Sequence, residues 1–121
     1  PIMHIPISLA SDDMAEQIAN ASLSADHTID GIIAASDLIA MNVLRCLHEK
    51  GCKVPEDVQV IGFDDLPLAS MTMPALSTVR QEIAKGAQVM VEKLKAHLRG
   101  EPIESLKMPP QLVKRGSTRA T

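Results

Sequence analysis

The stretch GIIAASDLIAMNVLRCLHEKGCKVPEDVQVIGFDD, residues 31–65, decides the fold of this chain. It opens with a short apolar run, 31–35, which predicts a strand buried on both faces. Apolar residues then recur at helical spacing over 38–50, and Gly51 suits the position just after a helix. The run 58–63 predicts a second buried strand. Strand, helix and strand in about 30 residues form a βαβ unit, so the two strands should be parallel.

The segments on either side continue this alternation of strands and helices. Residues 2–9 predict a strand and residues 12–23 predict a helix, which Ser11 could cap. After the βαβ unit, the pattern predicts a short strand over 76–79, a helix over 82–100 and a final strand over 111–114. The expected fold class is therefore α/β, with a parallel sheet flanked by helices.

Composition narrows the classes of function. The chain has 121 residues, of which 45% are hydrophobic and 22% charged, as in one ordinary globular domain. Its net charge of −3 gives no basic footprint for nucleic acid. No apolar run approaches the roughly 20 residues of a membrane helix, so we expect no membrane partner. We interpret the start at Pro1, on strand-like residues, as a cut inside a longer protein.

The two cysteines, Cys46 and Cys52, fit neither a metal-binding pair nor a disulfide framework. Two reduced thiols are typical of a cytoplasmic protein. Phe63 is the one aromatic residue, so a binding site built from this chain alone would be short of aromatic surface.

Acidic residues follow both strands of the βαβ unit. Ser36 and Asp37 come after the first strand, and Asp64 and Asp65 come directly after the second. Carboxyl ends of parallel strands share one edge of the sheet, which is where open α/β sheets bind ligands. Asp37 could instead cap the helix behind it and Asp65 could close a turn, whereas no helix starts behind Asp64. Together the three acids favour a site.

Two chemistries suit such an acidic edge. Carboxylates accept hydrogen bonds from hydroxyl or N–H groups of a ligand. They could also hold Mg²⁺ for phosphoryl transfer, but residues 64–66 lack an Asp-x-Asp arrangement and no glycine-rich phosphate loop is present. We expect no catalytic group, no metal and no cofactor.

The motifs IIAASD, GCKVPEDV, IGFDD, PALSTVRQ and QLVKRGST occur in this order and spacing between Asp30 and Thr118. In this the chain resembles the effector-binding region of the lactose/galactose repressor (LacI/GalR) family of bacterial transcriptional regulators. The resemblance implies a type I periplasmic-binding-protein-like fold, in which a small molecule binds between two α/β subdomains.

The resemblance also implies which residues bind the ligand: Ser36, Asp37, Asp64 and Gln81, with Phe63 lining the cleft. The ligand would be a sugar, a sugar derivative or a nucleobase. The whole protein would be a cytoplasmic homodimer that binds operator DNA through a helix-turn-helix absent from this chain.

By the same resemblance, residues 1–81 form part of the C-terminal subdomain, and residues 82–121 form a return helix and strand that pack on an absent N-terminal subdomain. The apolar side of helix 82–99 would then lack its partner. We expect this helix to pack on a neighbouring chain, to dock elsewhere or to be poorly ordered.

Leu68, Met71 and Met73 are apolar residues in the loop 66–74, and they indicate a dimer interface or a cover for the local core. Three functions remain open at this point. The first is an effector-sensing part of a repressor, the second is a periplasmic sugar-binding protein of an uptake system, and the third is a Mg²⁺-dependent phosphoryl-transfer enzyme.

Overall fold

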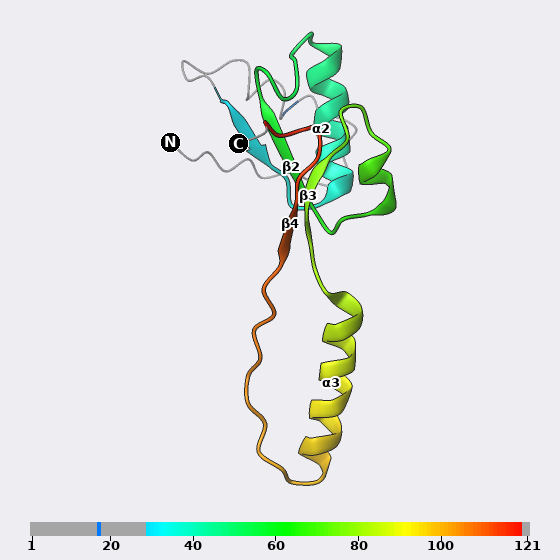
Figure 1. The fold of residues 1–121 in the computed structure, drawn as a ribbon, viewed down its shortest axis with the longest axis vertical. Helices are drawn as coiled ribbons and strands as arrows, with labels where there is room; N and C mark the ends of the chain where they lie inside the picture. Colours follow the sequence, from blue (N-terminus) through cyan, green and yellow to red (C-terminus); the bar gives the residue numbers. More distant parts are fainter. Residues whose placement is uncertain (1–16, 18–28, 120–121) are drawn as a thin grey trace.

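The structure is a computed structural model that describes residue 17 and residues 29–119. The strand expected over 2–9 and, apart from residue 17, the helix expected over 12–23 lie outside the described residues. The elements in chain order are β1 (Gly31–Ile33), α2 (Asp37–Glu49), β2 (Gln59–Phe63), the 3₁₀ turn η1 (Pro67–Ser70), β3 (Ser77–Arg80), α3 (Ile83–Leu98) and β4 (Gln111–Val113), as Figure 1 shows.

The strands form one sheet in the order β1-β2-β3-β4. β1, β2 and β3 are parallel, and β4 runs antiparallel to β3. The predicted βαβ unit, the short third strand and the closing strand are therefore confirmed. Because β1, β2 and β3 share a direction, their carboxyl ends meet at the same edge of the sheet.

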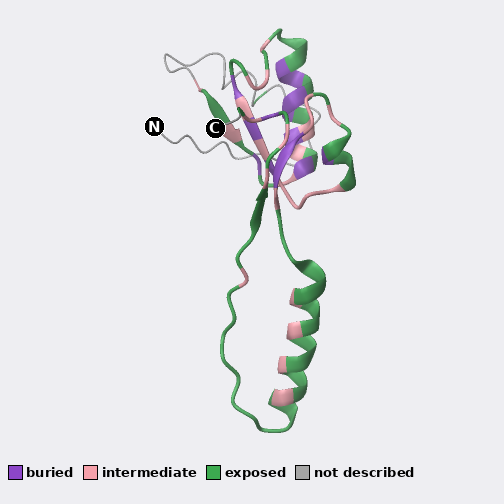
Figure 2. Cartoon of the chain, in the orientation of Figure 1, coloured by how far each residue is buried: buried purple, intermediate pink, exposed green. Residues whose placement is uncertain are grey.

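Helix α2 covers one side of this sheet and supplies much of the core. The Ser36 hydroxyl accepts a hydrogen bond from the Ile39 N–H at 3.4 Å and so caps the helix. The helix ends before Gly51, whose φ of 74° lies in the left-handed region that glycine tolerates. The buried core residues, purple in Figure 2, are Ala34, Ala40, Val43, Leu44, Leu47, Val58, Val60, Ala69 and Leu76.

The prediction that β1 is buried on both faces is wrong in the described structure. Ile32 packs against the core, whereas Ile33 is 80% exposed, since successive side chains of a strand point to opposite faces. β2 alternates in the same way: Val60 and Gly62 are buried, and the other three residues of the strand are half-buried. Among the described residues, the core lies mainly on the α2 side of the sheet.

The described chain divides into two regions, which we call the body (29–81 and 111–119) and the arm (82–110) (Figure 1). β4 pairs with β3 inside the body sheet, so the part expected over 82–121 is split between the two regions. The arm is α3 followed by an extended return segment. Figure 2 shows almost all of it in the colour of exposed residues, and α3 has no buried residue.

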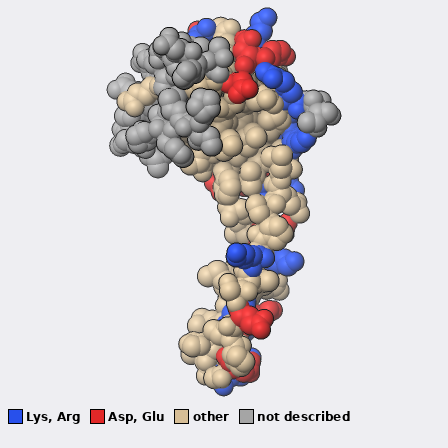
Figure 3. All heavy atoms as spheres, turned by 90° about the vertical axis from the view of Figure 1, so that its left-hand side faces the viewer, with Lys and Arg blue, Asp and Glu red and all other residues tan. Residues whose placement is uncertain are grey.

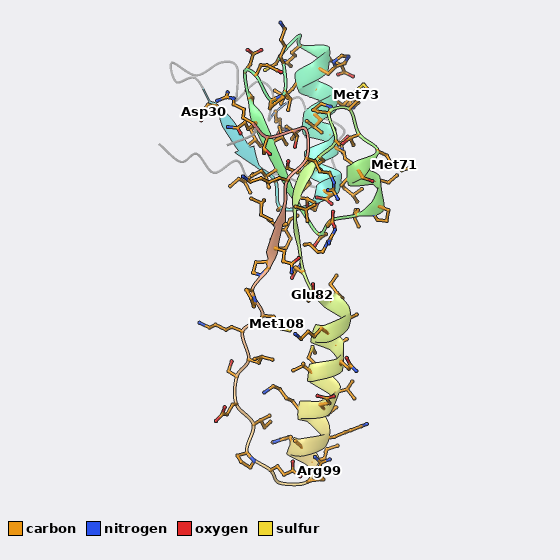
Figure 4. All side chains as sticks on the ribbon, viewed as in Figure 1. Asp30, Met71, Met73, Glu82, Arg99 and Met108 are labelled. Atoms are coloured by element: carbon orange, nitrogen blue, oxygen red, sulfur yellow. The ribbon has the colours of Figure 1, made fainter. Side chains whose placement is uncertain are left out.

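One side of α3 is in contact with the return segment. Lys93 Nζ donates a hydrogen bond to the Glu104 carbonyl oxygen, and Gly86 lies beside Met108. Glu82, Arg99 and Met108 mark the two ends of α3 and the return segment in Figure 4. The large apolar residues of the helix remain exposed: Ile83, Met90, Val91, Leu94 and Leu98. The apolar side of this helix is thus not covered by the described residues, and the three outcomes expected for it stay predictions.

Candidate functional site

The candidate site lies at the carboxyl edge of the sheet, where the ends of β2 and β3 meet. Phe63 is the last residue of β2, Asp64 follows it, and Gln81 follows the last residue of β3. The Gln81 Nε2 amide donates a hydrogen bond to Asp64 Oδ1 at 3.3 Å. We call the Asp64–Gln81 pair the rim. A hollow of about 230 Å³ lies beside it, lined by Phe63, Gln81, Glu82, Ile83, Gly86, Met108, Pro109 and Pro110.

The backbone turns sharply as it leaves β2. Asp64 has φ of 104° and Asp65 has φ of 54°, values that side-chain-bearing residues rarely adopt. Two hydrogen bonds stabilise this bend: the Asp65 N–H donates to Thr78 Oγ1 at 3.3 Å and the Leu66 N–H donates to Asp37 Oδ2 at 2.7 Å. Local sequence disfavours the bend, so these contacts with distant residues are what hold it.

Asp37 lies beneath the bend and not on the surface. It is fully buried, and its Oδ1 accepts a hydrogen bond from Thr78 Oγ1 at 2.5 Å. A Cβ atom on Gly62 would come within 2.2 Å of that same oxygen, so glycine leaves the room that the carboxylate occupies. Both Asp37 oxygens therefore serve protein donors. Asp37 is also the first helical residue of α2, and the cap is Ser36.

Asp65 does more than close a turn. Arg80 Nε donates to its Oδ2 at 2.6 Å and Arg115 Nη2 donates to its Oδ1 at 2.6 Å. The side chain of Arg80 is 48% exposed and that of Arg115 is 19% exposed. The Arg115 hydrogen bond is the main reason that the pKa of Asp65 lies below its ordinary value; partial burial opposes this shift and the Arg80 bond adds to it.

The three acids thus differ in what they can offer a ligand. Asp37 and Asp65 are occupied by protein donors, whereas Asp64, which is half-buried, meets one neutral amide at the long distance of 3.3 Å. A ligand hydroxyl or N–H group could replace or join that amide. The structure brings Phe63, Asp64 and Gln81 together. It places Ser36 and Asp37 at the start of α2, where Ser36 caps the helix and Asp37 supports the bend from below.

Three further properties of the described residues are their metal-binding groups, their surface charge and the hydropathy of their helices. Within the described residues, no three His, Cys, Asp or Glu side chains are grouped so that they could hold a metal ion. On the face that Figure 3 shows, charged side chains of both signs are scattered, and no large patch of one sign forms. No helix in the described part of the chain has the length and hydropathy needed to span a bilayer.

The loop 66–74 contains the residues expected at a dimer interface. Leu68, Met71 and Met73 are 54%, 77% and 96% exposed. Figure 4 shows Met71 and Met73 on the outer side of this loop, away from the sheet. They do not cover the local core, which leaves their apolar surface open to a partner.

Comparisons with known proteins identify the family. A family model described as a periplasmic binding protein-like domain matches residues 5–118. The ribose operon repressor of Halalkalibacterium halodurans is 35% identical over 109 residues, which cover 88% of this chain and 33% of that repressor. The chain belongs to the LacI family of transcriptional repressors.

Solved structures of LacI-family proteins share the fold. A regulator from Arthrobacter sp. FB24 in complex with lactose is 35% identical, with a TM-score of 0.75 over 91% of this chain and 42% of that one. A lac repressor dimer bound to operator and an anti-inducer is 28% identical, with a TM-score of 0.79 over 91% of this chain and 39% of that one.

The LacI-family relatives show two further things. The chain spans about a third of the length of the first curated relatives that it matches. These relatives are regulators, which favours a repressor over a periplasmic uptake protein or a Mg²⁺-dependent enzyme.

Sequence reasoning missed the residues that hold this LacI-family edge together. Thr78, Arg80 and Arg115 bind acids that lie between 15 and 50 positions away in the chain. Ser117 was missed as well: it is fully buried, donates to the Val60 carbonyl at 2.6 Å and accepts from the Ser77 N–H at 2.8 Å. A polar residue in a polar tail gives no signal of such burial.

Proposed function

We propose that this chain is the effector-sensing part of a cytoplasmic transcriptional repressor. A small molecule binds at the rim, and its binding changes the affinity of the whole protein for operator DNA, which a helix-turn-helix outside this chain would contact. The observation that carries the proposal is the Asp64–Gln81 pair beside the hollow at the carboxyl edge of a parallel sheet.

The chemistry of the rim suits a sugar, a sugar derivative or a nucleobase. Asp64 accepts hydrogen bonds, and the Gln81 amide can both donate and accept, so the pair matches neighbouring hydroxyl groups or an amide-like ring edge. Phe63 provides an apolar wall for the hollow. Ser36 and Asp37 contribute from beneath, since Ser36 caps α2 and Asp37 holds the bend on which Asp64 stands.

A thermal-shift screen of the full-length protein with lactose, ribose and adenine tests this proposal, since we expect the 121-residue chain alone to bind weakly or not detectably. A ligand present at a hundredfold excess over its dissociation constant stabilises a protein by about 2.7 kcal/mol. We expect one probe to raise the melting temperature, and we expect Asp64→Asn and Gln81→Ala to remove that gain. The matched control is Asp30→Asn, an exposed acid that precedes β1 at the opposite edge of the sheet.

A gain that survives Asp64→Asn would place the ligand elsewhere and contradict the proposed site. A gain that Asp30→Asn also removes would indicate a general charge effect, with the same consequence.

We also propose that the protein is a homodimer that associates through Leu68, Met71 and Met73. Their exposure supports this, as does a second hollow of about 510 Å³ that Met73 and Pro74 line together with the last turn of α2. Alanine at Leu68 and Met71 should shift sedimentation towards the monomer. Leu98→Ala, an equally apolar change on the arm, should not. A sedimentation profile unchanged in the first variant would contradict this interface.

The arm has a role in this proposal, as the surface on which a further subdomain packs. Its exposed apolar residues suit a further subdomain of the same protein, which would enclose the ligand from the side opposite the body. The division at residue 82 would then separate the part that carries the rim, 1–81, from the segment that reaches the second subdomain. β4 returns the chain to the body sheet.

A further inference from the structure

The Asp65 carboxylate joins the two strands that connect the body to the arm. Arg80 is the last residue of β3, which leads into the arm, and Arg115 follows β4, which returns from it. Asp65 Oδ2 accepts a hydrogen bond from Arg80, and Asp65 Oδ1 accepts one from Arg115, each at 2.6 Å. A single carboxylate therefore links the end of the strand that leads into the arm to the segment that follows the returning strand.

The same bend is tied to the core by a chain of hydrogen bonds. Thr78 Oγ1 accepts from the Asp65 N–H and donates to the buried Asp37 Oδ1. Arg115 also donates from Nη1 to the Leu76 carbonyl at 2.8 Å. Asp65 is thus fixed on the body side through Thr78 and Arg115, while its link to Arg80 reaches towards the arm.

This ion pair stands directly behind the rim. Asp64 precedes Asp65 and Gln81 follows Arg80, so the pair Asp65–Arg80 and the pair Asp64–Gln81 are consecutive bridges between the same two segments. The inner bridge is short and joins two charged groups, and the outer one is long and joins a carboxylate to a neutral amide. Fixing the inner bridge limits the separation of the two residues in the outer one.

We propose that Asp65 is a positioning residue of the rim: by holding Arg80 against a body-side anchor of Arg115 and Thr78, it sets the separation of Asp64 and Gln81 and the start of the arm. This inference rests on the proposed function only for the use made of the rim, since the arrangement itself involves no ligand. The Arg80 bond is the adjustable one, because its arginine is half-exposed and reachable by salt.

The test is the NMR signal of the Gln81 side-chain amide in the 121-residue chain, read in ¹⁵N-correlated spectra. Asp64→Asn replaces the partner carboxylate by an amide and so gives the position of this signal when the hydrogen bond is weakened. We expect Arg80→Met to move the Gln81 amide at least half of the way to that position. Arg80→Lys keeps the charge, so it should move the Gln81 signal less far than Arg80→Met does. Screening by 1 M NaCl should move the wild-type signal in the same direction as Arg80→Met.

The control is Arg45→Met, which removes an exposed ion pair with Glu49 on α2. It should leave the Gln81 amide unmoved. Arg80→Met keeps the shielded Arg115–Asp65 bond, so the chain should fold even if Asp65→Asn does not. A lowered melting temperature with an unmoved Gln81 amide in Arg80→Met would reduce Asp65 to a purely structural role and overturn the proposal.

An unmoved Gln81 amide in Asp64→Asn would overturn it as well, because the outer bridge would then be absent. Neither result depends on finding a ligand. Failure of the sugar and nucleobase screen would therefore count against the proposed function alone.

Discussion

The body and the arm each contain one amphipathic helix, yet the two helices have opposite environments. α2 buries Ala40, Val43, Leu44 and Leu47 against the sheet, whereas α3 buries none of its residues. Both sequences repeat apolar residues at helical spacing, so the pattern alone does not separate them. The difference teaches that amphipathic spacing predicts that a helix has an apolar side, and says nothing about which surface will cover that side.

The two regions should accordingly differ in what they add to the stability of the chain. The body has a core and a sheet with four strands, while α3 makes only peripheral contact with the other described elements. Cooperative unfolding should therefore report the body, and changes in the arm should leave it unaltered.

The largest contrast should come from one leucine in each region. Leu47→Ala removes a fully buried side chain of α2 and should lower the free energy of unfolding by about 2–5 kcal/mol, through lost transfer energy and a cavity. Leu98→Ala removes an exposed side chain of α3 and should change it by less than about 0.5 kcal/mol. Urea unfolding followed by circular dichroism measures both. Equal losses would show that the arm belongs to the same cooperative unit.

A smaller contrast should come from two glycines. Gly62→Ala puts a Cβ atom within 2.2 Å of Asp37 Oδ1 and should destabilise the body by about 2–3 kcal/mol, because a buried carboxylate must move. Gly86→Ala in α3 meets Met108 at the ordinary distance of 3.8 Å and should raise local helix stability by about 0.5–1 kcal/mol. Thermal unfolding gives the first value and helical content at 222 nm the second. An unchanged melting temperature in Gly62→Ala would mean that Asp37 does not sit above this glycine.

The smallest contrast should come from two acids paired with arginine. The pKa of Asp65 in the folded chain lies below its unfolded value of about 3.9. Its pairing with arginine therefore stabilises the fold above that pH. This stabilisation is lost as the pH falls through the folded pKa. Asp65→Asn should cost about 1–2 kcal/mol at pH 7, and the cost should shrink as the wild-type carboxylate becomes protonated below pH ~4.

The matched change in the arm is Glu101→Gln. Its ion pair with Arg99 is solvent-exposed, so water and salt screen it. Melting temperatures measured between pH 3 and pH 7 should separate Asp65→Asn from wild type and leave Glu101→Gln on the wild-type curve. A wild-type curve that Asp65→Asn follows at every pH would rule out a stabilising role for the two arginine bonds.

The sequence was sufficient for the parts of the fold that depend on neighbours in the chain. The run 31–65 predicts β1, α2 and β2 because apolar spacing and a terminal glycine both act within a few residues, although the cap of α2 proved to be Ser36 and not Asp37. The edge that carries Asp64 follows from strand direction alone. Exposure of the arm was expected from the resemblance to a family whose members have a further subdomain, and not from the residues of the arm themselves.

The roles of individual acids could not be read in the same way. Asp37, Asp64 and Asp65 look alike in the sequence, and they differ because Thr78, Gln81 and the two arginines reach them from other strands. Such contacts depend on register across the sheet, which no short motif encodes. The burial of Ile33 was misjudged for a related reason: an apolar run does not say how many sides of a strand will be covered.

The pairing of Arg80 with Gln111 has a consequence for how the molecule can change over evolution. These residues are direct partners in the antiparallel register, so the arm is an insertion at the mouth of a β-hairpin. A two-residue turn such as Asn-Gly could in principle close the same hairpin. Because loop length adds little to the entropy of closure, descendants of this gene can lengthen, trim or exchange the insertion while the strands beside it keep their alignment.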